Sequence, residues 1–182
     1  MGIVTTLPRE KAFTREDLDA MPDDGRRYEL LDGMLIVAAA PSFRHQRASG
    51  KLHLLLEEAL PEDQVVLYAP FDVALDEDTV LEPDLLVAPR EAFTDKDLPT
   101  APLLAVEILS PTTRRYDTTL KLNRFESAGC PAYWVVDPDV PEVTAWELRD
   151  GRYVEVAHVI GHDEWHATSP VEVTICPAGL LD

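Results

Sequence analysis

The amino-acid sequence predicts an α/β (α+β) fold with a mixed central sheet and a core in the order α-β-β-β-α-β. Two long stretches with helical spacing of apolar residues, 42–60 and 112–129, enclose three runs with strand-like composition. A fourth apolar run, 132–137, follows the second stretch. Asp-Gly pairs at 32–33 and 150–151 are typical of tight turns and predict an extra hairpin before the core and another after it.

The N-terminal part supplies a short helix and the first hairpin. Thr14, followed three residues later by Asp17, is typical of a helix N-terminus, and Pro22 ends this helix. Apolar runs on both sides of the first Asp-Gly pair predict strands near 26–31 and 34–39.

The core elements follow in order. Ser42 can cap the first long helix, whose leucines recur at helical spacing until Pro61, and Gly129 ends the second. The nearly all-apolar run after Gly129 is typical of a strand covered on both faces. The core strands are predicted within 64–75, 80–89, 102–109 and 132–137, and a hairpin within 143–159 precedes one last short strand.

The composition is that of an ordinary globular protein with one core. A length of 182 residues fits a single domain, and the apolar fraction of 46% is sufficient to fold it. We therefore expect one domain over 1–182, with 1–13 flexible. Two cysteines form no disulfide framework, and no run approaches the roughly 20 apolar residues of a membrane span. The sequence thus predicts a cytoplasmic protein without a membrane segment.

The net charge argues against a large nucleic-acid interface. The chain has 34 acidic and 16 basic residues, a formal charge of -18, and such a field repels a polyanion. Basic residues cluster in "RHQR" with Lys51 on the first long helix, and in "TRRYD" and "KLNR" on the second. If both helices flank one site, these clusters would form a local positive mouth for DNA.

Two acids lie in apolar runs that would form neighbouring strands. Asp84 follows a proline in "EPDLLV", and Glu107 lies within "LLAVEIL", where an unpaired charge is costly. The separation of 107 - 84 = 23 residues suits adjacent strands with a connection. Two close carboxylates repel unless one is protonated or a cation bridges them, and oxygen ligands favour Mg²⁺ or Mn²⁺.

Several segments carry a resemblance to a known family. They are "RRYELLDGML", "SFRHQR", "EPDLLV", "AVEILSPTTRRYD", "KLNRF" and "AGCPAYWVVDP". In this order and spacing, from about residue 14 to the C-terminus, they resemble the Uma2 (DUF820-type) family of the PD-(D/E)xK nuclease superfamily. The resemblance implies a restriction-endonuclease-like core with acids on its second and third strands.

The resemblance also implies roles for particular residues. Asp84 and Glu107 would bind the metal together with the carbonyl of Ile108. The superfamily pattern has a lysine two residues after the second acid, where this chain has Leu109. The resemblance implies that members of the family take this lysine from the following helix instead. Lys121 is the matching residue, and it would orient or activate the attacking water.

Four further residues are candidates for the same site. Glu29 resembles the acidic position of the family's N-terminal motif and would complete the catalytic group. His45 and Gln46, at the start of the first long helix, match the family's pattern and could face the pocket. Arg114 belongs to the basic cluster of the second long helix, and we expect these last three to bind substrate.

Each candidate also has an ordinary structural interpretation. Asp84 could end a strand, and Lys121 could form a surface ion pair with Asp117 four residues before it. Glu29 could be an exposed strand residue, and His45 an exposed residue of the first helical turn.

Three functions therefore remain open. The first is a metal-dependent endonuclease that hydrolyses DNA phosphodiester bonds. The second is a catalytically silent protein that keeps the fold for interaction or structure, which the negative charge and Leu109 favour. The third is hydrolysis of a small phosphorylated substrate. Because relatives in the superfamily are often dimers, a homodimer is also expected.

Overall fold

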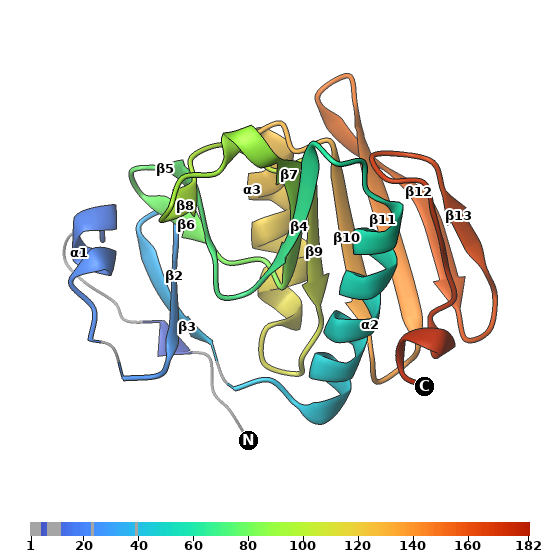
Figure 1. Cartoon of the computed structure of the whole chain (residues 1–182). Helices are drawn as coiled ribbons and strands as arrows, with labels where there is room; N and C mark the ends of the chain where they lie inside the picture. The colour runs from blue at the N-terminus through green and yellow to red at the C-terminus, as the bar shows by residue number, and fades with distance from the viewer. Residues whose placement is uncertain (1–4, 7–11, 23, 39) are drawn as a thin grey trace.

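The protein is known from a computed structural model that describes residues 5–6, 12–22, 24–38 and 40–182. Within these residues the strands form two six-stranded sheets and one two-stranded sheet (Figure 1). The first sheet contains, in spatial order, β1 (Thr5–Thr6), β3 (Met34–Ala38), β2 (Arg27–Leu31), β6 (Thr79–Leu81), β5 (Asp72–Asp76) and β8 (Asp97–Leu98). The second contains β12 (Arg152–Ile160), β11 (Glu142–Arg149), β10 (Ala132–Asp137), β9 (Leu104–Ile108), β7 (Leu85–Pro89) and β4 (Gln64–Tyr68). The remaining pair is β13 (Trp165–Ala167) and β14 (Val173–Ile175).

The helices begin where the sequence predicts caps. The helices are α1 (Arg15–Asp19), α2 (Phe43–Ala59), the π-helical segment η2 (Tyr116–Lys121) and α3 (Leu122–Ser127), with short 3-10 turns at Arg90–Ala92 and Ala178–Leu180. Thr14 and Asp17 form a capping box at α1, and the Ser42 side chain accepts a hydrogen bond from the His45 backbone N–H. The prediction that 1–13 is flexible falls largely outside the described residues. No helix among those residues is long and apolar enough to cross a membrane.

Both predicted Asp-Gly turns are confirmed. Asp32 and Gly33 have φ angles of 48° and 74°, and Asp150 and Gly151 have 51° and 74°. Two successive left-handed residues are the requirement of a type I′ turn, which asparagine, aspartate and glycine meet most readily. The turns join β2 to β3 and β11 to β12.

The second sheet is covered on both faces. Figure 1 shows α2 on one side of β9 and β10 and α3 on the other, with the first sheet beyond α3. The face toward α2 is apolar and includes Leu52 and Leu56 of the helix against Val106 and Trp134 of the strands. The opposite face packs against Phe125 of α3 and against residues of the first sheet.

Two of the predicted core strands are wrong in one respect, because each is divided between the two sheets. The run 64–75 becomes β4 and β5, and the run 80–89 becomes β6 and β7. Pro70 and Pro83 lie at the two breaks, and proline has no N–H to donate to a strand neighbour. β4 pairs with β7 in the second sheet, whereas β5 pairs with β6 in the first. Asp84 follows the second break directly.

The second long helix is also less regular than predicted. It contains the π-helical turn from Tyr116 to Lys121 before α3 begins. The hydroxyl of Tyr133, on β10 below the helix, donates a hydrogen bond of 2.8 Å to the carbonyl of Asp117 in this turn. Wide turns of this kind amount to one extra residue in a helix and are frequent at functional sites. Here the turn carries two buried charged side chains, Asp117 and Lys121.

Candidate active site

Asp84 directly precedes β7, and Glu107 lies on β9, the antiparallel neighbour of β7. β7 and β9 pair with Leu85 opposite Val106 and Leu86 opposite Ala105. Continuing this register by one residue places Asp84 opposite Glu107, on the sheet face that packs toward α3. The Ile108 backbone N–H donates a hydrogen bond of 2.8 Å to Asp84 Oδ2. The expectation that the two acids belong to adjacent strands is therefore confirmed.

Asp84 is held as a carboxylate by Arg27 and His45. Arg27 Nη1 lies 3.2 Å from Asp84 Oδ1, and His45 Nε2 lies 3.1 Å from Asp84 Oδ2. Burial alone would raise the pKa of Asp84, but the hydrogen bond from His45 and the charges of His45 and Arg27 outweigh it and lower this pKa to about 2. The interpretation of His45 as an exposed helix residue is wrong, because it is 9% exposed.

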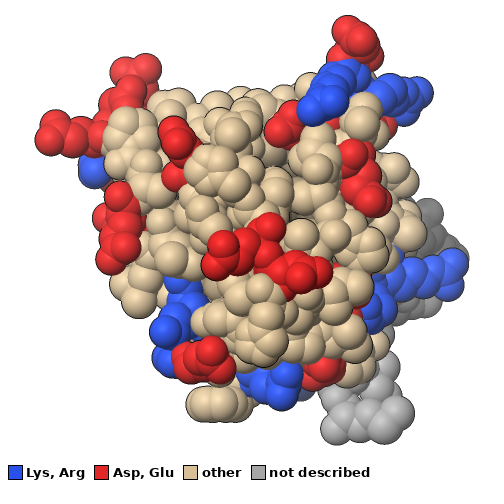
Figure 2. All heavy atoms as spheres, turned by 90° about the vertical axis from the view of Figure 1, so that its right-hand side faces the viewer, with Lys and Arg blue, Asp and Glu red and all other residues tan. Residues whose placement is uncertain are grey.

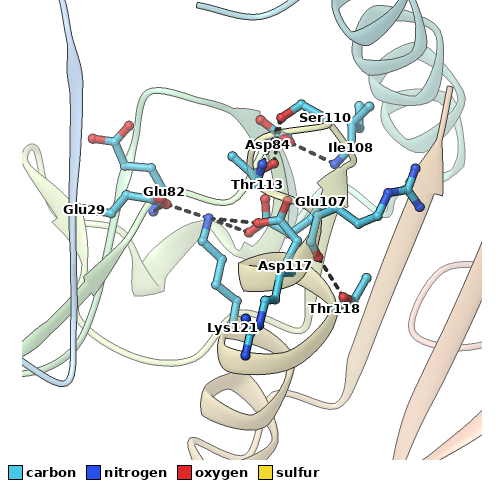
Figure 3. A network of polar contacts seen from close by, with 12 residues as sticks. Glu29, Glu82, Asp84, Glu107, Ile108, Ser110, Thr113, Asp117, Thr118 and Lys121 are labelled. Carbon is cyan, nitrogen blue, oxygen red and sulfur yellow. Dashed lines mark hydrogen bonds and ion pairs between the residues drawn. The ribbon is translucent and has the colours of Figure 1, made fainter. Parts of the chain in front are cut away.

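Lys121 lies among three carboxylates (Figure 3). Its Nζ is 2.8 Å from Glu29 Oε1, 3.1 Å from Glu107 Oε1 and 3.7 Å from Asp117 Oδ1. Burial would lower the pKa of Lys121, but these charges outweigh it and raise the pKa, so the ammonium group stays charged. The pair with Asp117 exists, yet both side chains are only 2% exposed, so the interpretation as a surface ion pair is wrong.

Two of the carboxyl groups around Lys121, those of Glu107 and Asp117, are less easily ionised than ordinary acids. Burial raises the pKa of Glu107 well above its ordinary value, although the charge of Lys121 opposes the shift. Burial likewise raises the pKa of Asp117 to about 6. Glu29 accepts a second hydrogen bond, of 2.7 Å, from the Glu82 backbone N–H, and it is 2% exposed rather than an exposed strand residue. These groups form one buried ionic cluster.

Two cavities border this cluster. Each has a volume of about 410 Å³. Both are lined by Gly25, Arg27, Pro41, His45 and Asp84. The first extends past Glu107 and Asp117 to the loop of Ser110 and Thr113, and the second extends past Glu82 to Tyr68. Lys121 lines neither cavity, so it lies behind Glu107 as seen from the first one.

The remaining predicted site residues lie farther from the cluster. Gln46 is exposed and lines the second cavity but not the first. Arg114 lines neither cavity, and its half-exposed guanidinium group donates to Asp137 at 2.5 Å. Ile108 contacts Asp84 through its backbone N–H, as described above.

Sequence reasoning missed two residues of the cluster, Arg27 and Glu82, and took Asp117 only as a surface partner of Lys121. A period of two along β2 places Arg27 and Glu29 on the same side of the strand, and this signal could have identified the arginine. Spacing of four along the helix did pair Asp117 with Lys121, but it gave no sign that the pair is buried. Glu82 carried no such signal, because the break between β6 and β7 decides where it points.

Comparison with known proteins identifies the family. A model of the Uma2 family, described as "Putative restriction endonuclease", matches residues 15–177. The chain belongs to the Uma2 family. Among solved structures, the crystal structure of "a putative nuclease belonging to DUF820 from Anabaena variabilis ATCC 29413" is similar, with a TM-score of 0.71 and 17% sequence identity over 93% of this chain and 97% of that chain. This likeness confirms the predicted fold. No curated protein matches the chain.

The cluster of this Uma2 chain has the composition of a cation site. It contains five carboxyl groups, those of Glu29, Glu82, Asp84, Glu107 and Asp117, against the permanent charges of Arg27 and Lys121. Glu82 Oε2 and Asp117 Oδ1 are buried without a hydrogen-bond partner. Among the described residues no three His, Cys, Asp or Glu side chains already surround one point as metal ligands. Mg²⁺ commonly needs only one or two carboxylates besides water, so these residues fit such an ion.

Proposed function

We propose that this protein is a metal-dependent nuclease that hydrolyses phosphodiester bonds of DNA at Asp84 and Glu107. The observation that carries the proposal is the placement of Asp84 opposite Glu107, at the wall of a cavity and within an excess of buried negative charge. The proposal is supported by membership of the Uma2 family, whose description is "Putative restriction endonuclease". The reaction adds water across one P–O bond and leaves a phosphate monoester and an alcohol.

Asp84, Glu107 and the carbonyl of Ile108 would hold Mg²⁺ or Mn²⁺. Restriction-endonuclease-like nucleases generally use divalent metal ions. Such an ion polarises a phosphoryl oxygen and lowers the pKa of bound water. The low pKa of Asp84 keeps it ready to bind a cation at neutral pH, since it is ionised without one.

Arg27 is the cation that faces the substrate in this proposal. It lines both cavities and stays protonated, because the surrounding carboxylates raise its pKa despite burial. Its guanidinium group has five donors, of which the Asp84 contact engages Nη1. The buried Nε lies 3.7 Å from Glu82 Oε2, which leaves Nη2 to bind a phosphoryl oxygen and stabilise the charge that grows there.

Lys121 acts through Glu107. Its ammonium group meets three carboxylates and lines neither cavity, so we assign it to neutralising and positioning Glu107, with Glu29 fixing the lysine from the other side. The prediction that Lys121 orients or activates the water requires the ammonium group to turn toward the cavity when substrate binds. His45 and Gln46 would contact substrate from α2, and Arg114 would bind a neighbouring phosphate after leaving Asp137.

The negative charge limits how much DNA the protein can contact. On the face of β12 and β13, acidic side chains are scattered and Lys and Arg lie near the margins (Figure 2). Binding that depends on phosphate neutralisation needs clustered cations. The proposed contact is therefore confined to the cavities, where Arg26 and Arg27 are available.

Calorimetric titration of Mn²⁺ and Mg²⁺ at low salt tests the proposal. The wild type should bind, and the isosteric double variant Asp84→Asn/Glu107→Gln should not. Asp97→Asn is the matched control, because it removes a buried carboxylate that pairs with Arg15 away from the cluster, and it should bind as the wild type does. Cleavage of DNA by the wild type, lost in the double variant, completes the test. If the wild type binds no metal, the proposal is wrong and a catalytically silent protein is the better description.

The cellular form is part of the same proposal. We expect a homodimer that works in the cytoplasm, where its two cysteines, both free in the structure, stay reduced. Light scattering of the purified protein measures the oligomeric state, and a monomer at all concentrations would contradict the dimer.

A further inference from the structure

The two cavities adjoin each other at the ionic cluster, and we call them together the trough. They share five lining residues, and Arg27, His45 and Asp84 are the polar ones among them. The proposed reaction centre therefore lies between two spaces of equal volume rather than at the end of one. A phosphate monoester has one organic group and needs one such space, whereas a diester has a nucleoside on each side.

The reacting acids lie deep in this trough. The side chain of Asp84 is 5% exposed and that of Glu107 is 1% exposed. A phosphate of a rigid duplex is held at the outside of a wide cylinder, and its bases are stacked and paired. A flexible unpaired strand can instead place its phosphate at the floor and its sugars and bases in the spaces on both sides.

The second cavity carries a platform for a base. Tyr68 lines it and is 63% exposed. The ring of His53 on α2 meets the Tyr68 ring edge-on, with centroids 5.2 Å apart and an interplanar angle of 79°. This contact supports the ring without covering it, and exposed aromatic rings are the usual stacking partners of unpaired bases.

The backbone fixes this platform relative to the reaction centre. Tyr68 ends β4, where it pairs with Leu85, the residue after Asp84. The next residue, Ala69, donates its N–H to the carbonyl of Asp84 at 3.1 Å. The ring and the proposed metal ligand therefore belong to one hydrogen-bonded unit.

We propose that the trough binds an unpaired DNA strand, with one phosphodiester between the two cavities at Arg27 and Asp84 and a flanking base stacked on Tyr68. This inference rests on the proposed function and names its substrate class. Confinement to a short strand also suits the charge of -18, since few phosphates enter the repulsive field.

Binding is measured separately from cleavage. The probe is a fluorescent oligodeoxythymidylate of about six nucleotides, a length within the usual range of single-strand sites. Anisotropy is followed at low salt with Ca²⁺ in place of Mg²⁺, and electrophoresis confirms that the probe stays intact. Competitors are the same strand paired with its complement, thymidine 5′-monophosphate, and the matching oligouridylate. Tyr68→Phe keeps the ring, Tyr68→Ala removes it, and Leu54→Ala removes a comparably exposed apolar side chain of α2 that lines neither cavity.

The expected result is binding of the single strand about tenfold or more tighter than of the duplex or the monophosphate. Tyr68→Ala should weaken it by about tenfold, and Tyr68→Phe and Leu54→Ala should bind as the wild type does. Equal affinity in Tyr68→Ala, tighter binding of the duplex or the monophosphate, or tighter binding of the oligouridylate would each overturn the inference. Failure to cleave with Mn²⁺ despite the expected binding pattern would overturn the proposed function instead.

Discussion

The two faces of the second sheet come from the same strands but bury different chemistry. On β9, Leu104, Val106 and Ile108 face α2 and join an entirely apolar core. The alternate residues, Ala105 and Glu107 on β9 and Leu109 just after it, face α3, so that a carboxyl group takes the place of one core side chain. The face toward α2 is stabilised by apolar burial, whereas the face toward α3 contains like charges that repel unless they are paired.

The difference shows how the fold and the site share one scaffold. Apolar packing tolerates exchange of one hydrophobic side chain for another of similar volume. A buried ion pair does not, because removal of one partner leaves an uncompensated charge. The α2 face can therefore maintain the fold while the α3 face keeps a fixed set of charges at the cavities.

The largest expected effect is on the charged face. In metal-free buffer, Lys121→Met should lower the free energy of unfolding by about 3–5 kcal/mol, because Glu29, Glu107 and Asp117 lose their shared partner. Urea denaturation at neutral pH measures this. The double variant Lys121→Met/Glu107→Gln should recover part of the loss, since one of the carboxylates becomes neutral. A loss below about 1 kcal/mol would be the behaviour of a surface pair and would contradict the cluster.

A similar but slightly smaller loss is expected on the apolar face. Leu52→Ala should lower the free energy of unfolding by about 3 kcal/mol. Leu52 is 0% exposed in the core between α2 and the second sheet, so its truncation leaves a cavity. Leu54→Ala, at a 59% exposed position of the same helix, should change it by less than about 0.5 kcal/mol. Calorimetric Mn²⁺ binding should be unchanged in both. Weakened metal binding in Leu52→Ala alone would show that the two faces are not independent.

A peripheral ion pair should contribute less and should depend on pH. The Thr94 hydroxyl and Arg15 lower the pKa of Asp97 in the folded protein. A lowered carboxyl pKa stabilises the protein above the ordinary value of 3.8, and this stabilisation is lost as pH falls through the folded value. Asp97→Asn should therefore cost about 1 kcal/mol at pH 7, with the difference from the wild type shrinking toward about pH 3. A constant difference across thermal melts at these pH values would contradict the assignment.

The smallest effect concerns how tightly the α3 face is closed. Burial raises the pKa of the Cys130 thiol to about 11, and the thiol donates to the carbonyl of Ala132. Cys176 is only partly buried. A maleimide at neutral pH should therefore modify Cys176 first, and Cys130 only after unfolding, because the thiolate is the reactive form. Mass spectrometry of the digested protein measures both sites, and modification of Cys130 in the folded protein would show that this face opens.

The sequence predicted what periodicity and turn chemistry determine. The Asp-Gly turns, the Ser42 cap and the neighbouring placement of Asp84 and Glu107 follow from local rules and are found in the structure. The division of the runs at Pro70 and Pro83 was missed, because an apolar run does not show which of two sheets each half joins.

The cluster around Lys121 was predicted only in part for a related reason. Glu107 was identified by its place in an apolar run and Lys121 by family resemblance, but their partners come from elements far apart in the chain. Arg27 and Glu29 lie on β2 of the other sheet, and only the packing of the two sheets brings them to Asp84 and Lys121. Strand periodicity gives the face of each residue, but not which faces meet.

Because the π-helical turn carries Lys121, the lysine beside Glu107 comes from a helix and not from the same strand. Where acid and lysine share a strand, as in the superfamily pattern, their separation along the chain is fixed at two residues. Here the lysine arrives from a helix that follows a loop, at a distance of 14 residues from Glu107. Insertions in that loop would leave the ammonium group in place as long as the helix re-docks. A related chain with a loop of different length keeps the same ion pair at a different spacing. A search that fixes the spacing would overlook such a chain, while a search for matching positions in space would find it.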